Sequence, residues 1–102
     1  MDENFFAERI ASLRNQKNVS AREMSLAIGQ NESYINRIEN HRALPSMQNF
    51  FYICEYLDVT PSEFFDSSNK NPEKLNLILQ ELSSLNEKQL DVILLIIENF
   101  KK

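Results

Sequence analysis

The sequence predicts an all-α protein, with a five-helix domain followed by a C-terminal hairpin of two helices. Apolar residues recur at spacings of three and four, the period of one face of an α-helix, and no alternating run indicates a strand. Capping residues followed three positions later by an acid or an amide mark several helix starts. At 102 residues and 42% apolar content, the chain has room for one domain of roughly 60–70 residues and an appendage.

The first helix is expected over about 5–16, where three apolar residues form one stripe: Phe6, Ile10 and Leu13. The second begins at Ser20, because Ser20 and Glu23 have the spacing of a capping box, in which each side chain bonds a backbone N–H of the other residue. The third is expected to have Asn31 as its N-cap and to end near Asn40.

The chain's single glycine, Gly29, lies between two short amphipathic segments. Met24 and Ile28 share one helical face before it, and Ile35 and Ile38 share one after it. Glycine adopts a positive φ without a Cβ clash, as a tight turn between helices requires. Two short helices joined by such a turn form a helix-turn-helix, a unit that in many proteins places its second helix in the major groove of DNA.

Two further helices complete the first domain. Ser46 caps a fourth helix, which carries Phe50, Ile53, Cys54 and Leu57. Thr60, Pro61 and Glu63 supply a capping residue, a first-turn proline and an acid at the third position, so a short fifth helix follows. The expected core residues are Ile10, Leu13, Met24, Ile28, Ile35, Ile38, Phe50, Ile53 and Leu57.

The expected boundaries are 1–66 for the first domain, 67–71 for a polar linker and 72–102 for the C-terminal hairpin. The first helix of the hairpin has an apolar face made of Leu75, Ile78, Leu79 and Leu82. The second, capped at Asn86, has a main face that we expect to mediate dimerisation: Leu90, Ile93, Leu94, Ile97 and Phe100. Two helices alone cannot bury this much apolar surface. Because burial of apolar surface is worth ~25 cal/mol per Å², a partner surface that covers it is implied. That partner is a second copy of the chain or, alternatively, the first domain.

The net charge of −4 argues against indiscriminate binding to nucleic acid, but the charge is unevenly distributed. Residues 9–42 contain six basic and three acidic side chains, a local net charge of +3. The basic side chains are Arg9, Arg14, Lys17, Arg22, Arg37 and Arg42. A locally basic face on an acidic protein fits a DNA-binding protein that avoids other polyanions.

Other classes of function have little support. The lone His41 has no nucleophile beside it, and the sequence has no metal-ligand cluster and no glycine-rich phosphate loop, so we expect neither an enzyme nor a bound cofactor or metal. The single Cys54 forms no intramolecular disulfide, is expected to be a small buried residue, and favours a cytoplasmic protein. The longest apolar run is too short to span a bilayer, so no membrane partner is expected.

Five segments carry a recognisable pattern in order: Leu13-Arg14, residues 20–29, residues 33–40, Pro45-Ser46 and residues 57–64. With these segments, the chain resembles the phage-repressor and Cro-like (XRE-type) helix-turn-helix family over about residues 5–66. Four positions depart from the family pattern. Ser25 replaces a usual Ala, Gln30 replaces an apolar residue, Ala21 replaces a Gln that contacts the DNA backbone, and His41 replaces a Gly.

The resemblance implies which residues contact DNA. The base-reading residues are Glu32, Ser33, Asn36 and Arg37, with Arg37 suited to guanine and Glu32 to cytosine. The phosphate-binding residues are Arg22, Asn31, Tyr34, Asn40 and Arg42. Glu32 is either a cytosine reader or a cause of weak binding, because a carboxylate near phosphates is repelled unless it meets a donor. Arg14 and Glu39 are expected to form an internal ion pair.

The sequence therefore predicts a sequence-specific transcription regulator, a repressor that binds double-stranded DNA as a homodimer on an inverted repeat. The two half-sites are expected about one helical turn, ~34 Å, apart. The alternative is a protein-interaction module that keeps the helix-turn-helix fold and acts through its C-terminal hairpin. An antagonist protein or another regulator would then be the partner of that hairpin.

Overall fold

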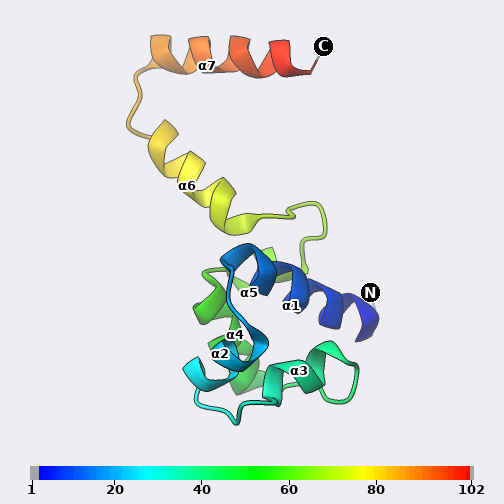
Figure 1. Cartoon of the computed structure of the whole chain (residues 1–102). Coiled ribbons are helices and arrows are strands. Elements are labelled where there is room, and N and C mark those ends of the chain that lie inside the picture. The colour runs from blue at the N-terminus through cyan, green and yellow to red at the C-terminus, as the bar shows by residue number, and fades with distance from the viewer. Residues whose placement is uncertain (1–2, 102) are drawn as a thin grey trace.

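The computed structural model describes residues 3–101, and over this range the chain forms seven α-helices joined by turns and loops. Helices α1 to α5 pack into one body, while α6 and α7 extend away from it (Figure 1). The predicted all-α class is confirmed. The helices are α1 (Glu3–Lys17), α2 (Ala21–Ala27), α3 (Tyr34–Glu39), α4 (Met47–Leu57), α5 (Pro61–Phe65), α6 (Pro72–Leu82) and α7 (Glu87–Phe100).

The core of the domain lies where α1 to α5 meet, with Met24 contributed by α2. All the expected core residues are buried except Ile28, which packs partly buried against the cluster edge. Phe6, Phe50 and Phe64 form its aromatic part, with ring centroids 5.1 to 5.8 Å apart. Cys54 is buried as expected, and its burial raises the pKa of the thiol to about 11. The thiol is therefore a small apolar side chain at neutral pH.

Helix caps predicted from the sequence account for most of the helix starts. Ser46 accepts a hydrogen bond from the backbone N–H of Asn49, as an N-cap does. Complete capping boxes are present at Thr60 with Glu63 and at Asn86 with Gln89. The hydrogen bond from the backbone N–H of Thr60 is the main cause that lowers the pKa of Glu63. Ser20 makes only its own half of the predicted box, accepting from the Glu23 N–H at 2.9 Å.

The predicted start of the third helix is wrong by two residues. Helix α3 begins at Tyr34, and its N-cap is Ser33 rather than Asn31. The Asn31 carboxamide oxygen accepts from both the backbone N–H and the hydroxyl of Ser33, at 3.1 and 3.0 Å. Asn31 therefore closes a local turn that competes with helix formation over residues 31–33.

The sequence predicts Arg9 as part of a basic face, and the structure shows instead that it is buried. Only 6% of the residue is exposed. Its guanidinium donates to four backbone carbonyls at the end of α5 and beyond, those of Glu63, Phe64, Asp66 and Asn69, at 2.7 to 3.2 Å. Desolvation lowers the pKa of Arg9, and the charge of Asp66 opposes that shift. Arg9 therefore joins α1 to the chain leaving α5.

The segment expected to be a linker is anchored to the first domain rather than detached from it. Besides the Arg9 contacts, the Gln16 carboxamide donates to the Lys70 carbonyl, and Pro72 is buried. On α6, the Asn76 carboxamide donates to the Glu63 carboxylate at 3.0 Å. The first turn of α6 therefore leaves the domain in a fixed direction, while the division of the chain into domains stays a prediction.

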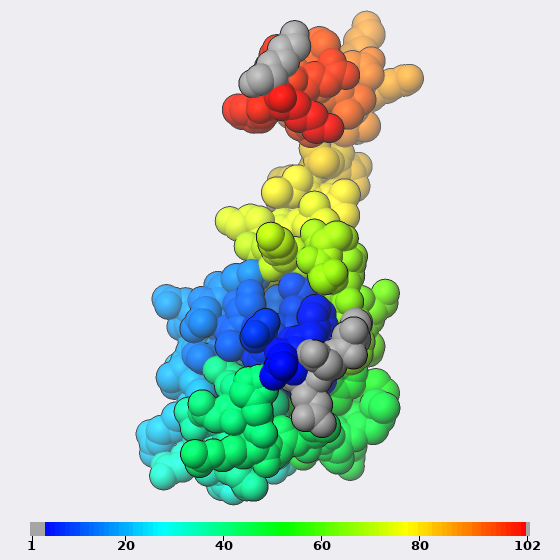
Figure 2. Space-filling view, turned by 90° about the vertical axis from the view of Figure 1, so that its right-hand side faces the viewer, coloured from blue at the N-terminus to red at the C-terminus, as the bar shows by residue number. Residues whose placement is uncertain are grey.

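Helix α7 does not pack on the first domain, as Figure 2 also shows. This contradicts the alternative in which the hairpin folds back, at least for α7. Helices α6 and α7 diverge from the turn between them instead of forming a closed pair (Figure 1). Their apolar side chains stay largely exposed in the single chain. No helix within residues 3–101 is long and apolar enough to cross a membrane.

We predict that Arg9→Met destabilises the domain. The substitution leaves several buried or partly buried carbonyls without a donor, and each unsatisfied group costs ~1–3 kcal/mol. We expect a loss of at least about 2 kcal/mol in the free energy of unfolding, measured by urea denaturation. Lys17→Met is the control on the same helix, because the Lys17–Asp58 pair at 3.1 Å is partly exposed and worth ~1 kcal/mol or less. Equal effects of the two substitutions would contradict the assigned role of Arg9.

Candidate nucleic-acid interface

The turn between α2 and α3 depends on the conformation of Gly29. Its φ is +79°, in the region that residues with a Cβ rarely adopt. An added Cβ would meet no atom within 4 Å, so the requirement is one of backbone conformation and not of space. The N–H of Gly29 bonds the Leu26 carbonyl at 3.1 Å, and the N–H of Gln30 bonds the Ser25 carbonyl at 2.9 Å. These bonds satisfy carbonyls at the end of α2 and direct the chain into α3.

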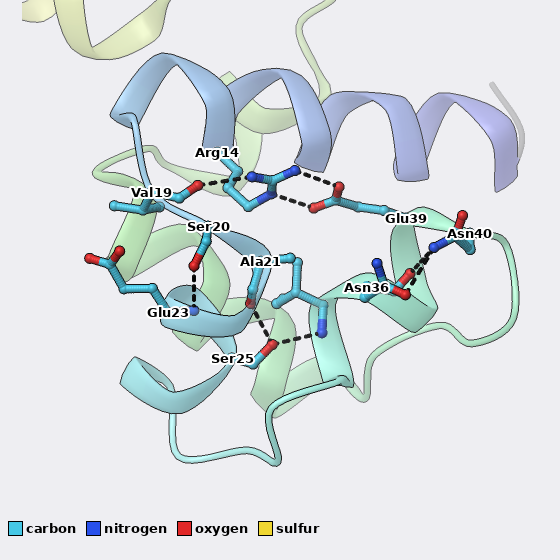
Figure 3. Close-up of polar contacts among 10 residues, drawn as sticks. Arg14, Val19, Ser20, Ala21, Glu23, Ser25, Asn36, Glu39 and Asn40 are labelled. Carbon is cyan, nitrogen blue, oxygen red and sulfur yellow. Dashed lines mark hydrogen bonds and ion pairs between the residues drawn. The ribbon is translucent and has the colours of Figure 1, made fainter.

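Ser25 attaches the start of α3 to α2 (Figure 3). Its fully buried hydroxyl donates to the Ala21 carbonyl at 2.7 Å and accepts from the N–H of Ile35 at 2.9 Å. The second bond satisfies an N–H in the first turn of α3 that no helical carbonyl can reach. Sequence reasoning did not predict this polar role of Ser25. The presence of a hydroxyl where the family usually has Ala is the signal that could have indicated it.

Arg14 and Glu39 form the predicted ion pair, which fixes the other end of α3 (Figure 3). Two parallel hydrogen bonds, at 2.7 and 2.9 Å, join the guanidinium of α1 to the carboxylate of α3. The same guanidinium donates to the Val19 carbonyl at 2.8 Å. The side chains are 15% and 13% exposed, and the hydrogen bond with Glu39 is the main cause that raises the pKa of Arg14. Neither side chain is therefore available to DNA.

All four residues predicted to read bases are exposed, along α3 and the turn before it: Glu32, Ser33, Asn36 and Arg37. Asn36 accepts from the Asn40 carboxamide, through its backbone carbonyl at 2.8 Å and its side-chain oxygen at 3.0 Å. Ser33 is held by Asn31, as described above. The structure thus brings these side chains to one exposed edge, and it orders Ser33, Asn36 and Asn40 through local hydrogen bonds.

Arg22 and Glu32, assigned separately to phosphate and base, contact each other. The guanidinium of Arg22 on α2 donates to the Glu32 carboxylate at 3.0 Å, and the side chains are 69% and 65% exposed. An exposed pair of this kind is worth ~0–1 kcal/mol, so DNA can replace either partner. The two residues are ten positions apart in sequence, on either side of the turn, so no helical spacing predicted their contact.

The phosphate-binding candidates lie around this exposed edge. Arg42 is exposed on the loop after α3, which begins with His41 at a φ of +62°. His41 therefore adopts the left-handed conformation that glycine would adopt at lower cost. The Tyr34 hydroxyl is half-buried at the start of α3, where it accepts a hydrogen bond from Asn49 of α4 at 3.0 Å.

Besides Arg22, half of the six basic residues counted over residues 9–42 bond partners within the domain. Arg9 and Arg14 bond internal partners, and Lys17 pairs with Asp58. Arg37 and Arg42 are exposed and form no ion pair with any side chain of residues 3–101. The positive charge near α3 therefore comes from these two residues, together with Arg22 when Glu32 is engaged elsewhere.

Comparison with known protein families identifies the class of this protein. A family model described as helix-turn-helix matches residues 10–64, which is just over half of the chain. The chain therefore belongs to the Cro/C1-type (XRE) helix-turn-helix family, whose members are DNA-binding transcription regulators. Searches of curated proteins and of solved structures found no match to the chain.

We predict that Ser25→Ala destabilises the protein, although alanine is the better helix former and the usual residue of the family here. The substitution leaves the buried N–H of Ile35 without its acceptor, at a cost of ~1–3 kcal/mol. Thermal unfolding is the measurement, with Ser12→Ala at an exposed position of α1 as the control. A Ser25→Ala protein as stable as the Ser12→Ala protein would show that the hydroxyl does not hold α3.

Proposed function

We propose that this protein is a sequence-specific transcription repressor that inserts α3 into the DNA major groove and binds an inverted-repeat operator as a homodimer. One observation carries the proposal. Helix α3 is held on one side by buried Ile35 and Ile38 and by the Arg14–Glu39 pair, while its other side exposes Asn36 and Arg37. A rigid helix with an exposed polar edge is what major-groove reading requires.

Base contacts would come from the exposed edge. The two-pronged guanidinium of Arg37 matches O6 and N7 of guanine, and the Glu32 carboxylate can accept from N4 of cytosine. The Arg22–Glu32 pair supports the second contact, because Arg22 offsets the repulsion between the carboxylate and nearby phosphates. Ala21 cannot make the phosphate contact that a Gln usually makes at this position in the family. On DNA, Arg22 would supply a phosphate contact in its place. Ser33 and Asn36 would add hydrogen bonds to neighbouring base edges.

Phosphate contacts would fix the position of α3 in the groove. Asn31, Tyr34 and Asn40 carry hydrogen-bonding groups near the two ends of α3, and Arg42 carries a charge just beyond it. Such contacts set register and orientation, and base contacts then supply sequence preference. Each phosphate neutralised by a cation releases counterions, so the affinity should fall steeply with salt concentration.

Dimerisation through α7 is supported by the distribution of its apolar side chains. At 100° per residue, the apolar positions of α7 from Leu90 to Phe100 cover an arc of roughly 260°. One neighbouring helix covers much less than this arc, so α7 needs at least two neighbours. In the single chain these side chains are exposed, except Leu90 and Ile93, which are half-buried. Two copies would bring together four helices with unburied apolar faces. A bound dimer would repress by occupying its operator.

We predict that Arg37→Ala and Arg42→Ala weaken DNA binding in different ways. Full-length protein selects its sites from random duplex DNA at about 100 mM salt, and affinities are then measured over a range of salt concentrations. Loss of Arg37 should relax the sequence preference at one base pair in each half-site, with a loss of binding free energy of ~1–3 kcal/mol for each. Loss of Arg42 should weaken binding to all duplexes alike and reduce the slope of log affinity against log salt concentration by about one per subunit.

Lys88→Ala, which removes a positive charge from α7, is the control for net charge and should leave the selected sequence unchanged. Enrichment of the same inverted repeat by the wild type and by Arg37→Ala would contradict the assignment of Arg37 to base reading. Absence of any enriched repeat with the wild type would contradict the proposed function as a whole.

We predict that Leu94→Ser shifts the protein toward the monomer, whereas Glu98→Ser does not. Both residues are exposed on α7 in the single chain, but only Leu94 belongs to the apolar arc. A buried leucine contributes ~1.5–3 kcal/mol, and a symmetric dimer loses two of them, so the dimer dissociation constant should rise by about 100-fold or more. Sedimentation equilibrium measures both proteins. Equal dissociation constants would place the dimer interface elsewhere.

A protein-interaction module is the second candidate, and one observation favours it. Only a few cations remain available near α3, on a protein with a net charge of −4, whereas the exposed apolar surface of α7 is large. In this case α7 would dock another regulator or an antagonist protein, and the DNA-binding domain would be a scaffold. Substitutions of Arg37 would then have no effect on function, and those of Ile93 or Ile97 would abolish it.

A further inference from the structure

Three polar side chains form a connected chain beside α3. Gln30 lies in the turn before α3, Tyr34 in its first turn, and Asn49 in the first turn of α4. The Gln30 carboxamide nitrogen donates to the Asn49 carboxamide oxygen at 3.4 Å, and the Asn49 carboxamide nitrogen donates to the Tyr34 hydroxyl at 3.0 Å. All three side chains are half-buried, so water competes with these bonds less than it does at the surface.

The direction of these bonds determines what the Tyr34 hydroxyl can do. A carboxamide has distinct donor and acceptor ends, and Gln30 occupies the acceptor end of Asn49 with a donor. Asn49 therefore presents its donor end to Tyr34, whose oxygen acts as the acceptor. The hydroxyl proton is not used in this bond and is left to donate to another group. A phosphate oxygen is an acceptor only, so this is the orientation that a phosphate contact needs.

We propose that Asn49 is a positioning residue for DNA binding, which with Gln30 orients the Tyr34 hydroxyl to donate to a backbone phosphate. This inference rests on the proposed function and deepens it, because it assigns roles to two residues, Gln30 and Asn49, that act through Tyr34. It also accounts for Gln30 at a position where the family usually has an apolar residue. An apolar side chain at position 30 would leave the Asn49 carboxamide free to flip, which exchanges its donor and acceptor ends.

The competing explanation is that the three side chains only hold α4 against the helix-turn-helix. Both explanations predict some loss of stability when Asn49 is changed. They differ in whether the effect on DNA affinity depends on the Tyr34 hydroxyl. A substitution that reverses the direction of the bond while keeping the size of the side chain separates them.

Asn49→Asp makes this reversal, because a carboxylate only accepts and would bond the Tyr34 proton itself. Gln48→Asp is the matched control: it adds the same charge one position earlier, on an exposed residue of the same helical turn. The experiment measures the affinity of the full-length protein for duplex DNA enriched from a random pool. The variants are Asn49→Asp, Gln48→Asp, Tyr34→Phe and the double variant Tyr34→Phe/Asn49→Asp, each checked by thermal unfolding.

We expect Tyr34→Phe and Asn49→Asp each to weaken binding about tenfold or more, because a hydrogen bond to a charged group is lost. Gln48→Asp should have a clearly smaller effect, and the double variant should bind no more than slightly worse than Tyr34→Phe. Additive effects of the two single substitutions, or equal effects of Asn49→Asp and Gln48→Asp, would overturn the inference alone. If the wild type binds no duplex above background, both this inference and the proposed function are overturned.

Discussion

The ion pair between Arg14 and Glu39 is the interaction on which the remaining geometry depends. Helix α3 has only six residues, too few to be stable by its own backbone hydrogen bonds. The bidentate pair attaches its last residue to α1, and the Ser25 hydroxyl attaches its first turn to α2. With these ends fixed and Ile35 and Ile38 buried, one edge of α3 faces solvent in a defined orientation. Loss of one partner of such a pair would cost ~3–5 kcal/mol where burial is complete.

Arginines serve two purposes in this domain, and burial separates them. Arg9 and Arg14 join α1 to other segments through carbonyls and a carboxylate, as planar guanidiniums with several donors do well. Arg22, Arg37 and Arg42 are exposed around α3. A count of basic residues along the sequence therefore overstates the charge available to DNA. The small remaining cluster limits non-specific attraction, so under the proposed function DNA affinity would depend on base contacts and on a second subunit.

Sequence reasoning was accurate where the signal is local. The caps at Ser46, Thr60 and Asn86 depend on residues three positions apart, and helical periodicity correctly identified most of the core. It was inaccurate where a residue meets a distant partner. The carbonyls bound by Arg9 lie more than fifty positions away, and their backbone atoms carry no residue signature. The start of α3 was missed because Asn31, a good N-cap, closes a turn of its own.

The central claim is that α3 reads the major groove through Arg37 on two symmetric half-sites. Protection of guanine N7 from methylation by the bound full-length protein tests it most directly, because N7 lies in the major groove. We predict protected guanines in two half-sites about one helical turn apart, with one guanine per half-site exposed again in the Arg37→Ala protein. Bound protein that leaves every guanine N7 reactive, or protection that Arg37→Ala does not alter, would contradict the claim.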